Sequence, residues 1–181
     1  MSFFKAYDMR GTFGVDFDLD TVYRVGKALP TVVRGSRWLV GRDCRVTSPQ
    51  VRDALVEGLL DAGVQVVDIG LCTTPMVYFF TAEEGFDGSV MVTASHNPPS
   101  DNGLKVSKKS ALPVGYANGL SEVERIVAAN PGDRCRGTYR GIDAVDEERL
   151  ERYLKWMREA NPGLDEINRE LKFAVDCSNG M

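Results

Sequence analysis

Short apolar runs alternate with stretches of helical periodicity over much of the sequence. The runs Trp38-Leu39-Val40, Val64–Gly70 and Gly88–Val92 are shorter than a typical helix and rich in β-branched or bulky apolar residues, which predicts buried strands. Ser48 is predicted to cap a helix with Pro49 at its first position, and Thr74-Pro75 is predicted to open another, because proline is favoured in the first turn of a helix and apolar residues at helical spacing follow. Strands separated by helices in this way indicate βαβ units with right-handed crossovers.

The predicted fold is therefore α/β, a three-layer α/β/α arrangement with a mixed, mainly parallel sheet. We expect one antiparallel strand, Leu104–Val106, after the loop that contains Ser95. Thr21–Val33 has apolar residues at helical spacing and should pack one face on the sheet. Pro30 is expected to kink this helix or to end its regular part early.

The C-terminal part of the sequence has weaker patterns. Arg134–Ala144 is predicted to be a linker hairpin without chemistry. Asp146 is a good capping residue for a helix that starts after it. Phe173–Asp176 is predicted to be a further strand.

Three carboxylates alternate in the segment Asp16-Phe17-Asp18-Leu19-Asp20. In an extended conformation they would lie on one face, as the ligands of a metal site do. The simpler interpretation is that Asp18 or Asp20 caps the helix that follows, while the other carboxylates favour its positive N-terminal end. We therefore predict a helix start here and no metal site.

Charge, cysteine spacing and hydropathy narrow the class of protein. The formal net charge is -4 and no basic block is present, so a nucleic-acid partner is not expected. No apolar run has the length of a membrane span, and the N-terminus lacks the pattern of a signal peptide, so no membrane partner is expected. Four widely separated cysteines and a single histidine disfavour a zinc site and are typical of reduced thiols, so a cytoplasmic location is predicted.

Ser95 follows the predicted strand Gly88–Val92 where the backbone turns, and the carboxyl ends of strands in open α/β sheets border the usual ligand site. It has three interpretations. A capping serine would satisfy loose backbone donors at the turn. A hydrolase nucleophile with His96 as its base is poorly supported, because adjacent residues tend to point apart and the flanks lack Gly-x-Ser-x-Gly. The third interpretation is the phosphorylated serine of a phosphotransferase.

The wider sequence favours the third interpretation. Thr93-Ala94-Ser95-His96-Asn97-Pro98, followed by Asn102-Gly103-Leu104-Lys105, resembles the phosphoserine loop of the α-D-phosphohexomutase superfamily. The closest likeness is to the phosphomannomutase/phosphoglucomutase branch. Tyr7-Asp8-Met9-Arg10-Gly11 is similar to the N-terminal signature of that family. Gly41–Ser48 resembles a loop that borders the active cleft, so Arg42, Asp43 and Arg45 are expected to shape that cleft.

This resemblance implies an enzyme that interconverts hexose 1-phosphates and hexose 6-phosphates, with Mg²⁺ as cofactor and a hexose 1,6-bisphosphate as intermediate and activator. Residues 1–145 would form the first of four domains and carry the phosphoserine loop. Residues 146–181 would form the linking helix and the first strand of a second, similar domain. The missing C-terminal domains would supply the other Mg²⁺ ligands, the sugar specificity and a further phosphate site, so the fragment alone is expected to be inactive.

The resemblance also implies roles for individual residues. Ser95 would carry the phosphate and bind Mg²⁺ through it. Lys105 would move the hydroxyl proton, Arg10 would act as a fixed cation near the transferred group, and His96 would hold the loop or contact phosphate. The residues expected to contact substrate or phosphate are Tyr7, Asn97 and Asn102.

Two alternatives remain open. The same mechanism on a phosphorylated amino sugar would make the protein a phosphoglucosamine-type mutase, although Tyr7–Gly11 fits that branch less well than the hexose branch. A non-catalytic sugar-phosphate-binding module is the other alternative, because the sequence contains no metal loop and no second phosphate site.

Overall fold

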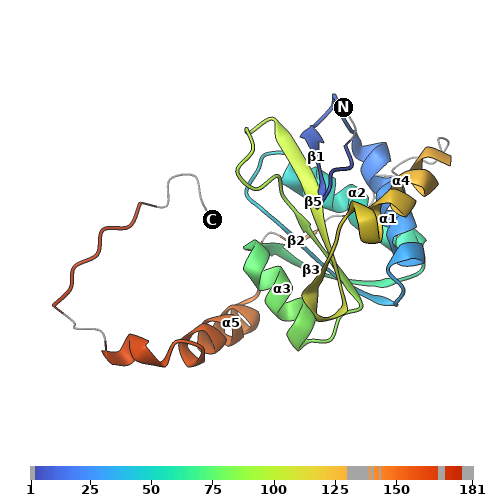
Figure 1. The fold of residues 1–181 in the computed structure, drawn as a ribbon. Helices are drawn as coiled ribbons and strands as arrows, with labels where there is room; N and C mark the ends of the chain where they lie inside the picture. The colour runs from blue at the N-terminus through green and yellow to red at the C-terminus, as the bar shows by residue number, and fades with distance from the viewer. Residues whose placement is uncertain (1–2, 130–138, 140, 143, 167–169, 177–181) are drawn as a thin grey trace.

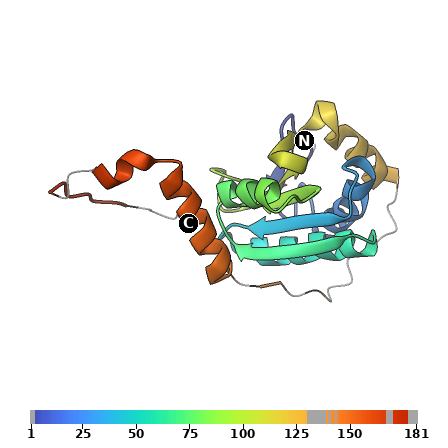
Figure 2. The ribbon, with the colours of Figure 1, turned by 90° about the horizontal axis from the view of Figure 1, so that it is seen from below.

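The computed structural model shows a mixed sheet between two layers of helices (Figure 1, Figure 2). The three-layer α/β/α fold predicted from the sequence is confirmed. The structure describes residues 3–129, 139, 141–142, 144–166 and 170–176. Within these ranges, no helix combines the length and the apolar character that crossing a membrane requires.

The strands are β1 (Met9–Thr12), β2 (Arg37–Arg42), β3 (Gln65–Leu71), β4 (Gly88–Val92), β5 (Asp101–Lys108) and β6 (Leu112–Val114). Their order across the sheet is β1-β5-β4-β2-β3, and β6 also pairs with β5. β2 is parallel to β3 and β4, whereas β5 is antiparallel to β4, β1 and β6. β5 is therefore the antiparallel strand expected after Ser95, and it is longer than the predicted Leu104–Val106.

Helices cover both faces of the sheet (Figure 2). α1 (Leu19–Val32), α2 (Ser48–Asp61) and α4 (Leu120–Ala129) share a hydrophobic core on one face, and α3 (Thr74–Glu83) packs on the other. α5 (Glu147–Glu159) contacts α3 and extends away from the sheet (Figure 1). The short 3₁₀ turns are Lys109–Ala111, Tyr116–Asn118 and Pro162–Glu166.

Alternate residues of β4 enter separate cores, because successive side chains of a strand point to opposite faces of a sheet. Val90 and Val92 pack in the core of α1, α2 and α4, whereas Met91 packs in the core of α3. In the register of β4 and β5, Leu104 lies opposite Val92 and Lys105 lies opposite Met91. Lys105 therefore lies on the face of the sheet that α3 partly covers.

The start of α1 agrees with the sequence-based interpretation. The carboxylate of Asp18 accepts hydrogen bonds from the backbone N–H and the hydroxyl of Thr21, which is the geometry of an N-cap. α1 runs through Pro30 and ends at Val32. The proline therefore lies close to the end of the helix but does not itself end it.

The start of α2 needs a correction. α2 begins at Ser48 with Pro49 in its first turn, as predicted, but the N-cap residue is Thr47 and it makes no side-chain capping bond. The Ser48 hydroxyl donates instead to Oδ1 of Asp43, at 2.5 Å. A carboxylate is a stronger acceptor than a neutral group, so Ser48 belongs to the hydrogen-bond network beneath the Ser95 loop.

α1 and α2 meet at glycines. A Cβ atom on Gly26 would lie 2.4 Å from the carbonyl oxygen of Leu55, and a Cβ atom on Gly58 would lie 2.1 Å from the carbonyl oxygen of Tyr23. These neighbouring atoms belong to the backbone and cannot turn aside as a flexible side chain would. The close approach of the two helices therefore depends on the absence of side chains at both positions.

Replacement of Gly26 by alanine is expected to lower the free energy of unfolding by about 1–3 kcal/mol, because the added methyl group overpacks the helix contact. Alanine's helix preference over glycine, roughly 1 kcal/mol, offsets only part of that strain. Urea unfolding of the two proteins measures the difference. Gly163→Ala is the control, because a Cβ atom there would meet nothing within 4 Å. A Gly26→Ala protein as stable as the wild type would contradict the close approach of α1 and α2 at this glycine.

The C-terminal part of the chain agrees only in part with the sequence-based prediction. Asp146 caps α5 as expected, because its carboxylate accepts from the backbone N–H of Arg149 at 2.8 Å. The strand predicted at Phe173–Asp176 does not form. A strand needs a neighbour to pair with, and here Phe173 is 75% exposed and Val175 is 81% exposed. The domain boundary after residue 145 stays a prediction.

Most of the linker hairpin predicted at Arg134–Ala144 lies outside the described residues, as does Cys177–Met181. One described part of the linker is tied to the sheet through a buried arginine. Arg52 donates to the carbonyl oxygen of Ile142 at 2.8 Å and pairs with Asp68 of β3 at 3.1 Å. The polypeptide therefore remains attached to the sheet just before α5 begins.

Candidate active site

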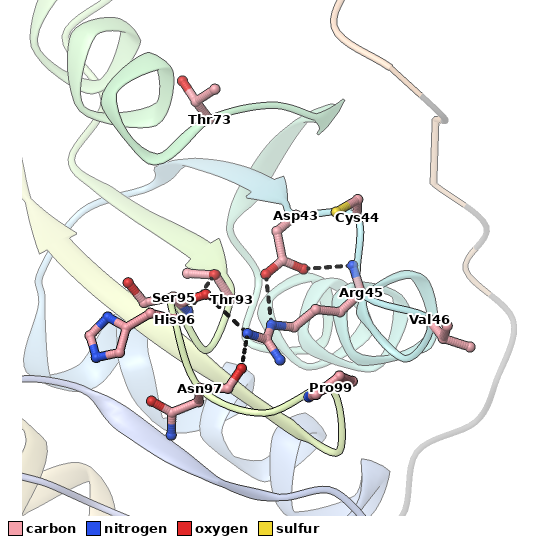
Figure 3. A pocket seen from close by; sticks show the side chains of 10 residues that line it. All are labelled: Asp43, Cys44, Arg45, Val46, Thr73, Thr93, Ser95, His96, Asn97 and Pro99. Carbon is pink, nitrogen blue, oxygen red and sulfur yellow. Dashed lines mark hydrogen bonds and ion pairs between the residues drawn. The ribbon is translucent and has the colours of Figure 1, made fainter. Parts of the chain in front are cut away.

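A cavity of about 710 Å³ lies at the edge of the sheet where β2, β3 and β4 end. The segments that follow these three parallel strands all contribute to its wall (Figure 3). The carboxyl ends of parallel strands border the usual ligand site of open α/β sheets, so the cavity lies where a ligand is expected. The lining residues are Asp43, Cys44, Arg45, Val46, Thr73, Thr93, Ser95, His96, Asn97 and Pro99.

Ser95 lines this cavity from a constrained backbone position. Its φ angle is 59°, in the left-handed region, which costs a non-glycine residue about 1–2 kcal/mol. Its backbone N–H donates to Oγ1 of Thr93 at 2.9 Å, and its side chain is exposed (Figure 3). Unfavourable backbone conformations of this kind cluster at functional sites, where the surrounding structure holds them.

Arg45 reaches from the loop after β2 to the loop after β4. Its Nε donates to Oδ2 of Asp43 at 3.1 Å, and the backbone N–H of Arg45 donates to Oδ1 of the same residue (Figure 3). Its two terminal nitrogens donate to the carbonyl oxygens of Ser95, Asn97, Pro98 and Asp101, at 3.0, 2.8, 2.6 and 2.9 Å respectively. Arg45 and Asp43 thus border the cleft, as the sequence predicted, and Arg45 also holds the Ser95 loop.

Asp8 joins the two cations that were predicted to act near Ser95. Its side chain is only 3% exposed, and it accepts from Nε of Arg10 at 2.8 Å and from Nζ of Lys105 at 3.2 Å. Arg10 lies opposite Gly103 in the pairing of β1 and β5, which brings its strand next to Lys105. The structure therefore brings Arg10 and Lys105 together through a buried carboxylate that sequence reasoning did not single out.

Arg10 also contacts the Ser95 loop. Its Nη1 donates to Oδ1 of Asn97 at 3.3 Å, and Nδ2 of Asn97 donates to Oδ2 of Asp101 at 2.9 Å. The hydroxyl of Thr12 donates to the other carboxylate oxygen of Asp101, also at 2.9 Å. Hydrogen bonds from Asn97 and Thr12 hold the pKa of Asp101 below its usual value of 3.8.

The lowered pKa of Asp101 predicts a loss of stability in acid. A carboxyl group with a lowered pKa in the folded state stabilises that state above its unfolded pKa, and this contribution is lost as the pH falls through the folded pKa. We expect the stability difference between the wild type and Asp101→Asn to be constant down to about pH 5 and to shrink below about pH 4. Urea unfolding at a series of pH values measures it. A difference that stays constant down to pH 2 would contradict the hydrogen bonds assigned to Asp101.

Asn102 is not among the residues that line the cavity. Its side chain is fully buried, and Nδ2 donates to the hydroxyls of Thr47 and Ser48 at 2.8 and 3.0 Å. Its Oδ1 accepts from the backbone N–H of Gly103 at 2.8 Å. The polar atoms of Asn102 are shielded from solvent and bonded within the protein, and its expected contact with phosphate stays a prediction. Asn102 instead ties the start of β5 to the start of α2.

Tyr7 and His96 both reach the solvent. Tyr7 is 84% exposed and adjoins Asp8, and His96 lines the cavity with its ring directed away from Arg45 (Figure 3). Within the part of the chain that the structure describes, neither side chain has a hydrogen-bond partner. Both side chains are therefore open to a ligand, and their predicted roles in contacting phosphate or substrate stay predictions.

The resemblance implies a magnesium ion, and the described side chains do not by themselves surround one. Among them, no three histidine, cysteine, aspartate or glutamate side chains gather as metal ligands would. Asp43 is bonded to Arg45, and Asp101 is bonded to Asn97. Mg²⁺ prefers oxygen ligands, so Ser95, through a phosphate, fits as one ligand. The remaining ligands would have to come from another part of the protein.

The fold and the cavity together define the class. It is an α/β/α domain that presents the exposed Ser95 at the carboxyl edge of its sheet, on a loop held by arginine side chains. The chain belongs to the phosphoglucomutase/phosphomannomutase family, because residues 1–132 match the family model for "Phosphoglucomutase/phosphomannomutase, alpha/beta/alpha domain I". The family inferred from the Ser95 loop is thereby confirmed.

Known proteins agree with this assignment. The chain is 39% identical over 181 residues to a phosphomannomutase from Escherichia coli, covering 98% of the chain and 38% of that protein. It is 42% identical over 148 residues to a phosphomannomutase from Klebsiella pneumoniae, covering 80% of the chain and 94% of that sequence. The crystal structure of a phosphoglucomutase/phosphomannomutase family protein from Burkholderia thailandensis aligns with a TM-score of 0.68 and 32% identity, covering 84% of the chain and 34% of that protein. The chain thus spans much less than half of the E. coli and B. thailandensis proteins.

Proposed function

We propose that this chain is the phosphoserine-bearing part of a phosphohexomutase that interconverts hexose 1-phosphates and hexose 6-phosphates. The observation that supports this most is the exposed Ser95, held in a left-handed conformation at the wall of a cavity. Membership of the phosphoglucomutase/phosphomannomutase family supports the same activity. The other domains of the polypeptide would complete the enzyme, and the 181 residues alone would be inactive.

In the proposed reaction, Ser95 carries a phosphoryl group in the active protein. A hydroxyl oxygen of the hexose phosphate attacks the phosphorus atom, the bond between phosphorus and Oγ of Ser95 breaks, and the hydroxyl proton is removed. The resulting hexose 1,6-bisphosphate then returns its other phosphoryl group to Ser95, so phosphate is conserved. Phosphoryl transfer requires chiefly in-line alignment of the reacting oxygens and neutralisation of the spreading charge.

The described side chains suit these tasks. Arg10 lies beside the loop through its bond to Asn97 and would act as a fixed cation, for which a planar guanidinium is well suited. Lys105 is the candidate for moving the hydroxyl proton. His96, Asn97 and Tyr7 would contact phosphate or sugar. Arg10 and Lys105 are 27% and 26% exposed, so a ligand can reach both.

Mg²⁺ would neutralise negative charge on the phosphoryl group when bound, with the phosphate on Ser95 as the ligand from this chain. We propose hexose phosphates as the substrates and the cytoplasm as the location. Cys44 is exposed and forms no disulfide among the described residues, which is consistent with a reducing compartment.

The test is a mutase assay of the full-length protein with Mg²⁺ and a trace of glucose 1,6-bisphosphate. Mannose 1-phosphate, glucose 1-phosphate and glucosamine 1-phosphate are compared, and formation of the 6-phosphate is followed by ³¹P NMR. We expect turnover of at least one of the two hexose phosphates at a higher rate than glucosamine 1-phosphate. A preference for glucosamine 1-phosphate would identify the amino-sugar branch, and the absence of turnover with all three would contradict the proposed activity.

A further inference from the structure

Arg45 uses every N–H donor of its guanidinium group. A guanidinium carries five N–H donors in a rigid planar fork. The guanidinium of Arg45 donates five hydrogen bonds: one from Nε to Asp43, two from Nη1 and two from Nη2. The side chain is only 12% exposed, so these bonds are largely shielded from water.

Four of the five acceptors are backbone carbonyl groups of the loop after β4 and of the first residue of β5. They belong to Ser95, Asn97, Pro98 and Asp101. Because one rigid plane contacts all four peptide groups, a movement of one strains its bonds to the others. The peptide of Ser95 is among them, so Arg45 fixes the backbone from which the Ser95 side chain projects.

A second set of bonds holds Arg45 itself. Asp43, which orients Nε of Arg45, accepts from the hydroxyl of Ser48 at 2.5 Å. Ser48 in turn accepts from Nδ2 of the fully buried Asn102 at 3.0 Å. The network therefore runs from the first residues of β5, through the start of α2, to the guanidinium beneath the loop.

We propose that Arg45 is the positioning residue of phosphoryl transfer at Ser95, an inference that rests on the proposed function. It fixes the four loop carbonyls, and thereby the direction of the Ser95 side chain, without exchanging a proton or a phosphoryl group. Lysine in its place keeps the positive charge, but its three donors sit on a single nitrogen and cannot span four carbonyl groups. Arg45→Lys therefore tests the donor geometry of the guanidinium while the positive charge at this position is kept.

The test compares wild type, Arg45→Lys and Arg34→Lys as full-length proteins. Arg34 is exposed and does not line the cavity, so it is the matched control. Hydrogen exchange followed by mass spectrometry reports on peptides that contain residues 93–101, and steady-state kinetics give kcat and KM. We expect faster exchange in that loop for Arg45→Lys only, with unchanged exchange in the strands. We also expect kcat to fall by about 10–100-fold while KM changes by less than about threefold.

Unchanged loop exchange in Arg45→Lys, or unchanged kcat, would overturn the proposal. If the wild type itself shows no turnover, the proposed function fails, and the exchange measurement still decides whether Arg45 holds the loop. If Arg45→Lys does not fold, Asp43→Asn tests the same network. It removes the carboxylate that orients Nε and leaves the four carbonyl bonds, so a smaller rise in loop exchange is expected. No rise would contradict the proposal.

Discussion

Ser95→Ala in the full-length protein is expected to reduce mutase turnover by at least about 10⁴-fold, because the atom that accepts and returns the phosphoryl group is lost. The free energy of unfolding should change by less than about 0.5 kcal/mol, since the Ser95 side chain is exposed. Steady-state turnover and urea unfolding of the same preparations measure both quantities.

Ser110→Ala provides a matched control for that experiment. Ser110 is also exposed and has a φ angle of 61°, close to that of Ser95, but it does not line the cavity. Its replacement tests whether a serine in a left-handed conformation is needed for the fold alone. Turnover retained by Ser95→Ala, or lost equally in Ser110→Ala, would argue against Ser95 as the phosphate carrier.

Asp8→Asn is expected to lower kcat/KM by about 100-fold, because misplacement of catalytic groups by about 1 Å has an effect of this size. The substitution keeps the shape of the side chain but removes the charge that Arg10 and Lys105 share. Both cations would then repel each other without a carboxylate between them. Loss of stability should accompany the loss of activity, by about 1–3 kcal/mol, since a buried partner of two charged groups is removed.

Glu151→Gln makes the same change of charge at an exposed position of α5 beyond its first turn and should leave kcat/KM and stability as they are. Kinetics and urea unfolding of the three proteins give the comparison. An Asp8→Asn protein with the kinetics of the wild type would show that Arg10 and Lys105 do not depend on their shared carboxylate.

Much of the fold was predictable because its determinants are local. The runs around Val40 and Val90 are apolar and short, and Asp18 and Asp146 occupy capping positions, so strands and helix starts follow from a few neighbouring residues. The position of Ser95 at a carboxyl edge also followed, since it comes directly after a strand of a mainly parallel sheet.

The parts that sequence reasoning missed depend on register and burial between distant segments. Asp8 becomes a site residue only because β1 pairs with β5, which brings Arg10 and Lys105 to the same carboxylate. Its place between Tyr7 and Arg10, inside a recognised motif, was the signal that could have drawn attention to it. Asn102 was assigned to phosphate from its motif, but pairing at the start of β5 buries it against α2.

Two further errors have different causes. Ser48 has the sequence pattern of a helix cap, yet its hydroxyl donates to the carboxylate of Asp43, five residues earlier in the loop that leads into α2. Phe173–Asp176 has the composition of a strand, but no described strand lies beside it to pair with. The first outcome depends on a nearby side chain that competes with the backbone, and the second on a pairing partner that the local sequence does not contain.

The most direct test of the phosphoserine assignment is intact-mass and peptide mass spectrometry of the full-length protein, purified without phosphatase treatment. We predict a single phosphate located on Ser95, which is lost when hexose phosphate is added and restored by glucose 1,6-bisphosphate with Mg²⁺. A Ser95 that carries no phosphate, and that glucose 1,6-bisphosphate with Mg²⁺ does not phosphorylate, would contradict the assignment and favour a non-catalytic sugar-phosphate-binding module.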